Sequence, residues 1–317
     1  MRDVFGVAAR WLDEERTFAL ATLVDLRDAA TAPIGTTIAV DASGRVFGNI
    51  GAGCYEAEIV GTCMKTAADG ETRRLDVNLT SDDEVMGGTA CGAVMRLVVW
   101  RPQSEFRDLA EAIATGRRET RLTFAYSEAD GTRVDFTYSF APKDRLILVG
   151  ATTLAAELAT IARRLDFDVV VIDPRPAFTT IERMGDETEI ARAWPDEYLP
   201  AELSDRTPVV VLSHDPKFDL PALRCALKSE APYIGLLGSR RSQAARRSSL
   251  RGEGFDESAI ARIHGPVGLD LGGTTVAETA LSILAEIVAT RRGGNGSPLR
   301  DAGGAIHRRL ERVARNA

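Results

Sequence analysis

The sequence is poor in residues that build metal and disulfide sites. Its 317 residues include only three histidines and four cysteines, and no two cysteines form a Cys-x-x-Cys pair. The missing pair excludes a zinc ribbon and a thioredoxin motif, and three scattered histidines argue against a histidine-rich metal centre. In a reducing compartment we expect all four thiols to be free. The cysteines are Cys54, Cys63, Cys91 and Cys225.

Long apolar runs are lacking as well, and the 46 acidic residues outnumber the 39 Lys and Arg residues. The formal net charge is -7, which argues against a general nucleic-acid surface. No run approaches the ~18 apolar residues that span a membrane, and the first residues lack the core of a signal peptide. We therefore expect a cytoplasmic protein with no membrane and no nucleic-acid partner.

The length favours two domains on a prior of ~100–200 residues each. Residues 1–140 mix strands with a few helices, whereas residues 145–292 alternate apolar strands with helices. That alternation is typical of βαβ units and a parallel sheet. The predicted fold class is α/β: an N-terminal α+β domain, then a Rossmann-like doubly wound domain, with a flexible basic tail over 293–317.

Two helices show clear apolar stripes. In the helix expected over 55–68, the stripe includes Cys63 and Met64, which predicts a core cysteine. The last helix, expected over 275–290, opens with Thr275 and Glu278 as a capping box. The residues predicted to face the core of that helix are Ala277, Leu281, Leu284 and Val288.

The stretch Gly51-Ala52-Gly53-Cys54 joins a strand-like run to that first helix. A thiol at a helix start lies beside unpaired backbone N–H groups, which favour the thiolate, and glycines let an anionic ligand approach the backbone. A buried cysteine after a tight turn is the alternative. The residues alone leave both open.

The second half departs from the dinucleotide fingerprint Gly-x-Gly-x-x-Gly. Gly150 keeps the first glycine, Thr152 replaces the second, and Ala155 stands at the third. Asp173 supplies the acid expected about 20 residues on. The pattern predicts the fold firmly, while a Rossmann-like domain that binds no dinucleotide stays open.

Further turns follow other strands of this half, where open α/β sheets bind ligands. His214 and Asp215 follow one strand. Gly238-Ser239-Arg240-Arg241 follows another and opens a helix, which is a suitable anion site. The turn from Gly265 to Asp270 precedes the last helix. A hydrogen-bonded loop histidine and a solvated arginine pair are the structural alternatives.

Taken together, these segments resemble the XdhC/CoxI family, the accessory proteins of molybdenum hydroxylases. The resemblance rests on Gly53-Cys54-Tyr55-Glu56, on Ala90-Cys91-Gly92, and on 214–219, 233–241 and 265–270 with Glu278 and 282–286. Ala52, Ala93 and the Gly150-Ala-Thr-Thr turn depart from the family pattern.

The resemblance implies a carrier of molybdenum cofactor (molybdopterin). Its partners would be an apo molybdenum hydroxylase and a cysteine desulfurase, with a homodimer left open. Cys54 and Cys91 would be molybdenum or sulfur ligands. The cofactor-binding residues it implies are Gly53, Cys54, Glu56, Cys91, Gly150, Asp173, His214, Asp215, Gly238, Ser239, Arg240, Gly268 and Asp270.

Three functional hypotheses follow. The first is a chaperone that protects sulfurated cofactor and delivers it to a xanthine dehydrogenase or CO dehydrogenase type enzyme, with no catalytic residue assigned. The second is an NAD(P)-dependent oxidoreductase that uses the Rossmann-like domain. The third is a non-catalytic module that only contacts a partner. Whether the chain is itself an enzyme stays open.

Overall fold

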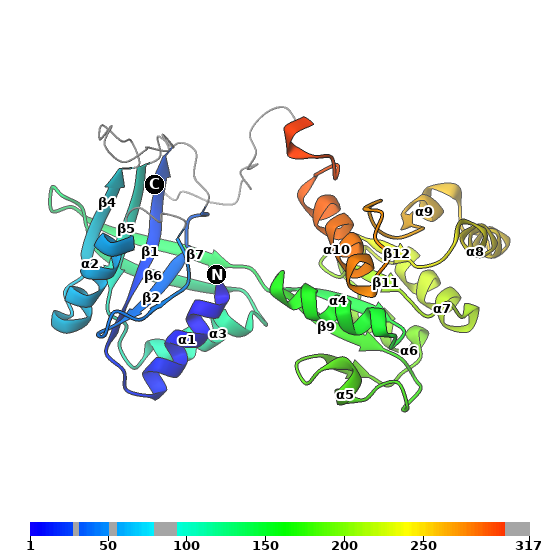
Figure 1. Ribbon diagram of the computed structural model, residues 1–317, viewed down its shortest axis with the longest axis horizontal. Helices are drawn as coiled ribbons and strands as arrows, with labels where there is room; N and C mark the ends of the chain where they lie inside the picture. Colours follow the sequence, from blue (N-terminus) through cyan, green and yellow to red (C-terminus); the bar gives the residue numbers. More distant parts are fainter. Residues whose placement is uncertain (28–31, 51–55, 79–93, 302–317) are drawn as a thin grey trace. The chain divides into compact units, whose positions relative to one another are not determined.

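The computed structural model describes residues 1–27, 32–50, 56–78 and 94–301 of the chain. The predicted site residues Gly53, Cys54 and Cys91 lie outside these described residues. The chain divides into two compact units, with the division between Pro142 and Lys143. Figure 1 shows the elements of both units.

Unit 1, residues 1–142, is an α+β unit built on an antiparallel sheet. Its described strands form one sheet in the order β3-β2-β1-β5-β4 and a separate hairpin of β6 and β7. Its elements are α1 (Arg2–Asp13), β1 (Phe18–Arg27), β2 (Thr37–Asp41), β3 (Val46–Phe47), α2 (Glu56–Asp69), β4 (Arg73–Asn78), β5 (Val94–Trp100), α3 (Phe106–Thr115), β6 (Thr120–Ser127) and β7 (Arg133–Phe140).

The central strand of unit 1 is buried on both faces. Alternate residues of β1 point to opposite sides, so Ala19 and Leu23 pack with α2 while Phe18 and Leu20 pack with α1. A strand covered on both faces has little need of polar residues, which explains the near-continuous apolar run at its start. The first seven residues of β1, from Phe18 on, are all buried.

Helix α2 lies on the sheet through Ile59, Cys63 and Ala67, all fully buried. The prediction that Cys63 belongs to the core is confirmed, and burial raises the pKa of its thiol to about 12. Met64 is 38% exposed, so its predicted place on the core stripe is wrong. Met64 lies next to the buried row on the helix surface, and the sheet covers only the row formed by Ile59, Cys63 and Ala67.

Unit 2, residues 143–301 of the described chain, is a doubly wound parallel-sheet unit. All its strand pairs are parallel. The described strands run in the order β10-β9-β8-β11-β12-β13. Its elements are β8 (Asp144–Val149), α4 (Thr153–Arg164), β9 (Phe167–Ile172), α5 (Ile181–Met184), β10 (Glu189–Ala191), α6 (Pro195–Glu202), β11 (Val209–Val211), α7 (Pro216–Leu227), β12 (Ile234–Leu236), α8 (Arg240–Gly252), α9 (Glu257–Ala261), β13 (Ile263–His264), α10 (Val276–Arg292) and η1 (Leu299–Asp301).

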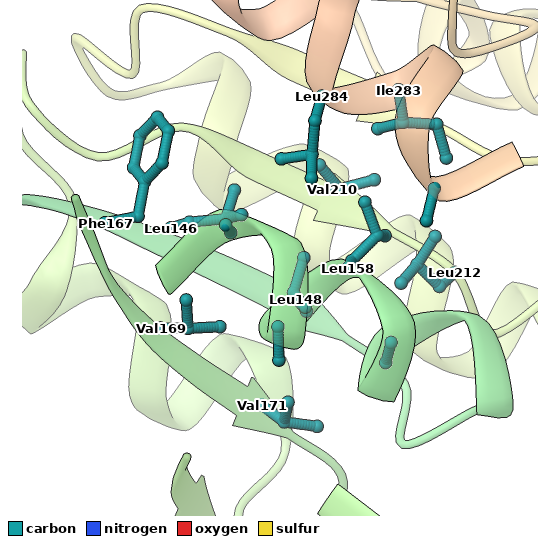
Figure 2. Packing of buried hydrophobic residues seen from close by; sticks show 14 of the residues in the cluster. Leu146, Leu148, Leu158, Phe167, Val169, Val171, Val210, Leu212, Ile283 and Leu284 are labelled. Atoms are coloured by element: carbon teal, nitrogen blue, oxygen red, sulfur yellow. The ribbon is translucent and has the colours of Figure 1, made fainter. Parts of the chain in front are cut away.

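The sheet of unit 2 is covered on both faces, which confirms the predicted α/β fold class. Leu146 and Leu148 of β8 face α4 and α10, where Leu158 and Leu284 meet them (Figure 2). Residues of β8 that alternate with these pack against α6 and α7 on the other face. Each large side chain removed from water contributes about 1.5–3 kcal/mol, so these layers hold the strand ends in place.

Helix α10 presents a different face to the core than the sequence predicts. Its buried residues are Ala280, Ile283, Leu284 and Ile287. Of the predicted stripe only Leu284 is buried, and Leu281 is 51% exposed. The helix carries apolar residues around much of its circumference, so periodicity does not select one face, and packing against α4 does. The predicted capping box of Thr275 and Glu278 is confirmed.

Several short elements of unit 2 were not predicted, among them α5, β10, α6 and α9. They have eight residues or fewer, too few for a clear periodic pattern. Among the described helices, none has the length and apolar character needed to cross a membrane.

Candidate functional site

The candidate site lies where the strands of the unit 2 sheet end. Because all these strands are parallel, their carboxyl ends share one edge, and the turns that follow line it. The chain leaves β8 toward β9 and β10, but leaves β11 toward β12 and β13. Ligands of open α/β sheets bind at such a reversal. We call these turns, residues 150–153, 173–175, 212–215, 237–239 and 265–270, the carboxyl edge.

The turn after β8 is closed by its own side chains. Gly150 has a φ of +107°, and a Cβ there would lie 3.0 Å from the backbone of Ser213, so only glycine fits. The Ala151 N–H donates to Asp173 Oδ2 over 2.9 Å. Thr152 Oγ1 accepts from the Ala155 N–H over 3.2 Å and caps α4. The Ala151 amide of this turn is thus already satisfied by a buried carboxylate.

Asp173 has an internal role in this arrangement. Its side chain is 1% exposed and accepts from Arg175 Nε over 2.8 Å and Arg175 Nη2 over 2.6 Å, as well as from Ala151. Burial alone raises the pKa of the Asp173 carboxyl, but these hydrogen bonds outweigh burial and the pKa lies below its ordinary value. A ligand that bound this carboxylate would have to displace Arg175.

The turn after β11 is tied to α8 through a buried ion pair. Arg246 Nε donates to Asp219 Oδ2 over 2.6 Å, and the two side chains are 8% and 0% exposed. Ser213 Oγ donates to Asp219 Oδ1 over 2.5 Å, and Arg246 Nη2 donates to the His214 carbonyl over 3.1 Å. The sequence did not indicate Arg246, because nothing in its local pattern points across 27 residues to Asp219.

His214 and Asp215 therefore sit on a firmly held loop. His214 has a φ of +60° and an exposed side chain at the carboxyl edge. The Asp215 carboxylate caps α7 by accepting the Lys217 N–H over 3.0 Å. That negative charge makes the start of α7 unsuited to an anion.

The turn after β12 is the positive one. Ser239 caps α8, and its Oγ accepts the Ser242 N–H over 3.3 Å. Arg240 and Arg241 are the first two helical residues; both are exposed, and the first turn of α8 contains no acid. The helix dipole and two guanidinium groups thus add their positive fields at one place. Among the described helices that begin at the carboxyl edge, α8 offers the best setting for a phosphate.

The turn after β13 is anchored by a carboxylate at its back. Glu286 Oε2 accepts from Tyr233 Oη over 2.6 Å and from the Gly268 N–H over 2.7 Å. Glu286 Oε1 lies 3.1 Å from His264 Nδ1, and the His264 and Tyr233 rings stack at 4.4 Å. Burial raises the pKa of the Glu286 carboxyl, but the Tyr233, Gly268 and His264 groups outweigh it, and the pKa falls below its usual value.

This network orients the His264 ring. A carboxylate at Nδ1 favours a proton on that nitrogen, which makes Nε2 the acceptor. The His264 side chain is 31% exposed. The sequence pattern indicated neither His264 nor Tyr233 as a site residue, because these two residues and Glu286 come from separate elements.

Two hollows lie near predicted site residues. In unit 2, a pocket of about 190 Å³ is lined by Asp270, Gly272, Glu278 and Ser282 among others. Gly268, with a φ of +104°, lies over Ser282, whose hydroxyl would be 2.5 Å from a Cβ at that position. Asp270 itself is exposed.

In unit 1, a pocket of about 400 Å³ is lined by Thr36, Thr37, Gly48 and Ile50 among others. Ile50 directly precedes the predicted Gly51–Cys54 stretch, which lies outside the described residues. Glu56 begins α2 with an exposed side chain. The described residues contain no group of three or more His, Cys, Asp and Glu side chains that could hold a metal ion.

Comparisons with known proteins match both units. The XdhC Rossmann domain model matches residues 146–287, and the XdhC and CoxI family model matches residues 11–78. The molybdenum cofactor insertion chaperone PaoD of Escherichia coli is 25% identical over 304 residues, covering 92% of this chain and 88% of PaoD.

Two further proteins extend the comparison. A probable xanthine dehydrogenase subunit of Bacillus subtilis is 23% identical over 321 residues, covering 89% of this chain and 95% of that protein. A crystal structure described as a xanthine dehydrogenase from Bacillus halodurans superposes with a TM-score of 0.75 at 20% identity, over 91% of this chain and 96% of that one. That likeness concerns the fold. Through the matches in both units, this chain belongs to the XdhC and CoxI family.

Proposed function

We propose that this protein binds molybdenum cofactor, protects it, and delivers it in sulfurated form to an apo molybdenum hydroxylase of the xanthine dehydrogenase or CO dehydrogenase type. The observation that carries the proposal is the contrast at the carboxyl edge. The turn after β8, which would hold a dinucleotide, is closed, whereas the turn after β12 suits a single phosphate. The name of PaoD, a molybdenum cofactor insertion chaperone, supports the same class of cargo.

Under this proposal the carboxyl edge binds the organic part of the cargo. Ser239 and Arg240 bind the phosphate at the start of α8, where the fields of the helix and the guanidinium add. Asp215 on the turn after β11 and Asp270 on the turn after β13 accept hydrogen bonds from the amino groups of a pterin ring. Gly238 and Gly268 allow the turns that carry Ser239 and Asp270, and Gly150 leaves room for the Ser213 backbone of the turn that carries Asp215.

The proposal assigns the metal end of the cargo to unit 1. Molybdenum prefers soft ligands, and Cys54 and Cys91 are the thiols of the two predicted glycine-cysteine blocks. Cys63 is excluded from that role by full burial and a raised thiol pKa. The partners are then the apo-hydroxylase and a cysteine desulfurase, met in the cytoplasm, and the protein acts as an accessory factor rather than as an enzyme. A homodimer is compatible with this role.

Purification from cells replete in molybdenum cofactor tests the proposal. We expect the wild-type protein to retain molybdenum and pterin, measured by elemental analysis and by the fluorescence of oxidised pterin. Cys54→Ser and Cys91→Ser should lower the retained molybdenum. Cys225→Ser is the matched control, because Cys225 lies half-buried on α7 of unit 2 and belongs to neither of these blocks. Retention of no pterin by the wild type, or equal retention by all variants, contradicts the proposal.

An NAD(P)-dependent oxidoreductase is the second candidate. The strand order β10-β9-β8-β11-β12-β13 is that of dinucleotide-binding folds, and this favours it. The closed turn at Gly150 and the engaged Asp173 oppose it. Titration with NAD(H) and NADP(H) separates the two candidates: a dissociation constant in the micromolar range would establish a nucleotide site, and we expect no saturation.

A further inference from the structure

A stack of flat side chains stands beside the carboxyl edge and has no part in the function proposed above. The indole of Trp194 lies on the ring of Phe218, with centroids 5.0 Å apart and planes 15° from parallel. The Arg175 guanidinium lies over the Phe218 ring at 5.2 Å and over the Phe178 ring at 4.3 Å. We call Trp194, Phe218, Arg175 and Phe178 the aromatic stack.

The aromatic stack draws its members from three separate turns. Arg175 and Phe178 follow β9, Trp194 precedes α6, and Phe218 lies in the first turn of α7. Convergence from three crossovers is unlike a single exposed apolar residue, which is common on any protein surface. Two hydrogen bonds fix the segments that carry the aromatic stack. Arg192 donates to the Thr179 carbonyl over 2.9 Å, and the Trp194 N–H donates to Glu197 Oε2 over 3.3 Å.

The aromatic stack is continuous with the candidate site. Arg175 donates to Asp173, and Asp173 in turn accepts from the Ala151 N–H of the turn after β8. An unbroken chain of contacts therefore leads from the reversal point of the sheet to Trp194. The aromatic stack therefore belongs to the same unit as the carboxyl edge and is in contact with it, which suits a ligand that carries a flat ring at one end.

Both ends of the stack are exposed, Trp194 to 41% and Phe178 to 39%, whereas Phe218 between them is 7% exposed. The Arg183 guanidinium lies over the Phe178 ring at 5.4 Å in addition to Arg175, so Trp194 is the end that offers a ring face. Since Phe218 covers one face of the indole, the exposure belongs to the other face and the edges. A flat aromatic face held parallel to a second ring is a preorganised surface for stacking, because the indole loses little freedom when a further ring joins it.

We propose that Trp194 forms the outer plane of a ring-stacking subsite, which takes the planar heterocycle of a ligand bound at the carboxyl edge. A pterin and a nucleobase share this chemistry. The inference rests on the proposed function for the identity of the ring, a pterin, and the experiment distinguishes the two sources. Stacking of a heterocycle on an aromatic side chain changes affinity by roughly 5- to 150-fold.

Tryptophan fluorescence gives a local readout for this subsite. The chain has three tryptophans, and Trp11 and Trp100 belong to unit 1, where Trp11 is 3% exposed and Trp100 packs on Phe106 and Phe124. Titration of the full-length protein with 6-carboxypterin should quench the emission of Trp194 in a saturable way. Separate titrations with AMP and CMP test a nucleobase as the ring. Equilibrium dialysis supplies the affinity independently of fluorescence.

Three variants make the test specific. Trp194→Ala should weaken binding of the ring by roughly tenfold. Trp194→Phe should bind within about threefold of the wild type by dialysis but lose the fluorescence change, because a phenyl ring still stacks. Leu165→Ala is the matched control: Leu165 is a 40% exposed apolar residue of unit 2, between α4 and β9, at the opposite edge of the sheet.

The outcomes separate the subsite from the function. Saturable binding of pterin, weakened only in Trp194→Ala, supports the subsite with a pterin as its ring, and the same result with AMP or CMP supports it with a nucleobase. Binding that is absent, or equal in Trp194→Ala and the wild type, overturns the inference, even where molybdenum and pterin still copurify with the protein. Stacking at Trp194 without copurified cofactor would uphold the subsite and contradict the proposed function.

Discussion

Two turns of the carboxyl edge share one local pattern and differ in what they offer a ligand. Gly150-Ala151-Thr152 and Gly238-Ser239 each place a glycine with positive φ before a hydroxyl side chain that caps a helix. The first turn meets Asp173, and its Ala151 amide is satisfied. The second leads into two exposed arginines. The difference teaches that a glycine turn becomes an anion site only when neighbouring elements leave its positive groups free.

The largest expected effect concerns the buried ion pair that ties the turn after β11 to α8. Asp219→Ala should lower the free energy of unfolding by about 3 kcal/mol, because it leaves the buried Arg246 guanidinium without its partner. Urea denaturation followed by circular dichroism measures this. Asp168→Ala, an exposed carboxylate of β9, is the control and should change stability by under about 0.5 kcal/mol. Equal effects of the two changes would show that the ion pair does not fix the turn after β11.

A pair of glycine substitutions compares the two turns directly. Gly150→Ala should cost about 2 kcal/mol, since the new Cβ meets the Ser213 backbone, which cannot move without shifting β11. Gly238→Ala meets the Ser242 hydroxyl, which can rotate, so its cost should be about 1 kcal/mol and come mainly from its φ of +140°. Thermal unfolding of both variants checks the order. The reverse order would mean that the turn after β12 is the tighter one.

Acid pH should weaken the closed turn selectively. The pKa of Asp173 is lowered in the folded protein, so its stabilisation is present above the unfolded pKa of about 3.9 and is lost as the pH falls through the lower folded value. Asp173→Asn should therefore be less stable than the wild type by about 1 kcal/mol at pH 7. The gap should shrink near pH 3. A gap that is constant over this range would assign the loss to packing rather than to charge.

The smallest expected effect concerns the turn after β12. Arg240→Ala should reduce retained pterin by about two- to fivefold, the size expected for one exposed charge at a helix start, and should leave stability unchanged. Arg251→Ala, which removes an exposed arginine from the last turn of the same helix, should leave retention as in the wild type. Pterin fluorescence after oxidation of equal amounts of protein gives the ratio. A similar loss of pterin in both variants would mean that the net charge of the protein, and not the charge at the start of α8, determines retention.

Much of the fold follows from local pattern. The apolar runs of β8, β9, β11 and β12 specify buried parallel strands, and Thr275 with Glu278 marks the start of α10. The face of α10 did not follow, because Ala277 and Leu281 fit a helical stripe as well as Ala280 and Ile283 do. Short elements such as α5 and β10 were missed for lack of length.

The positions of the candidate site residues were predictable from the sequence, but their hydrogen-bond partners were not. The sequence by itself determined a parallel sheet, and therefore one edge that gathers Gly150, Asp173, His214, Ser239 and Asp270, because parallel strands end together. Only the tertiary structure decided which of these groups remain available. Asp173 is taken by Arg175 and Ala151, and Glu286 holds Tyr233, His264 and Gly268. Such pairings join residues distant along the chain, so they depend on packing, which local pattern does not encode.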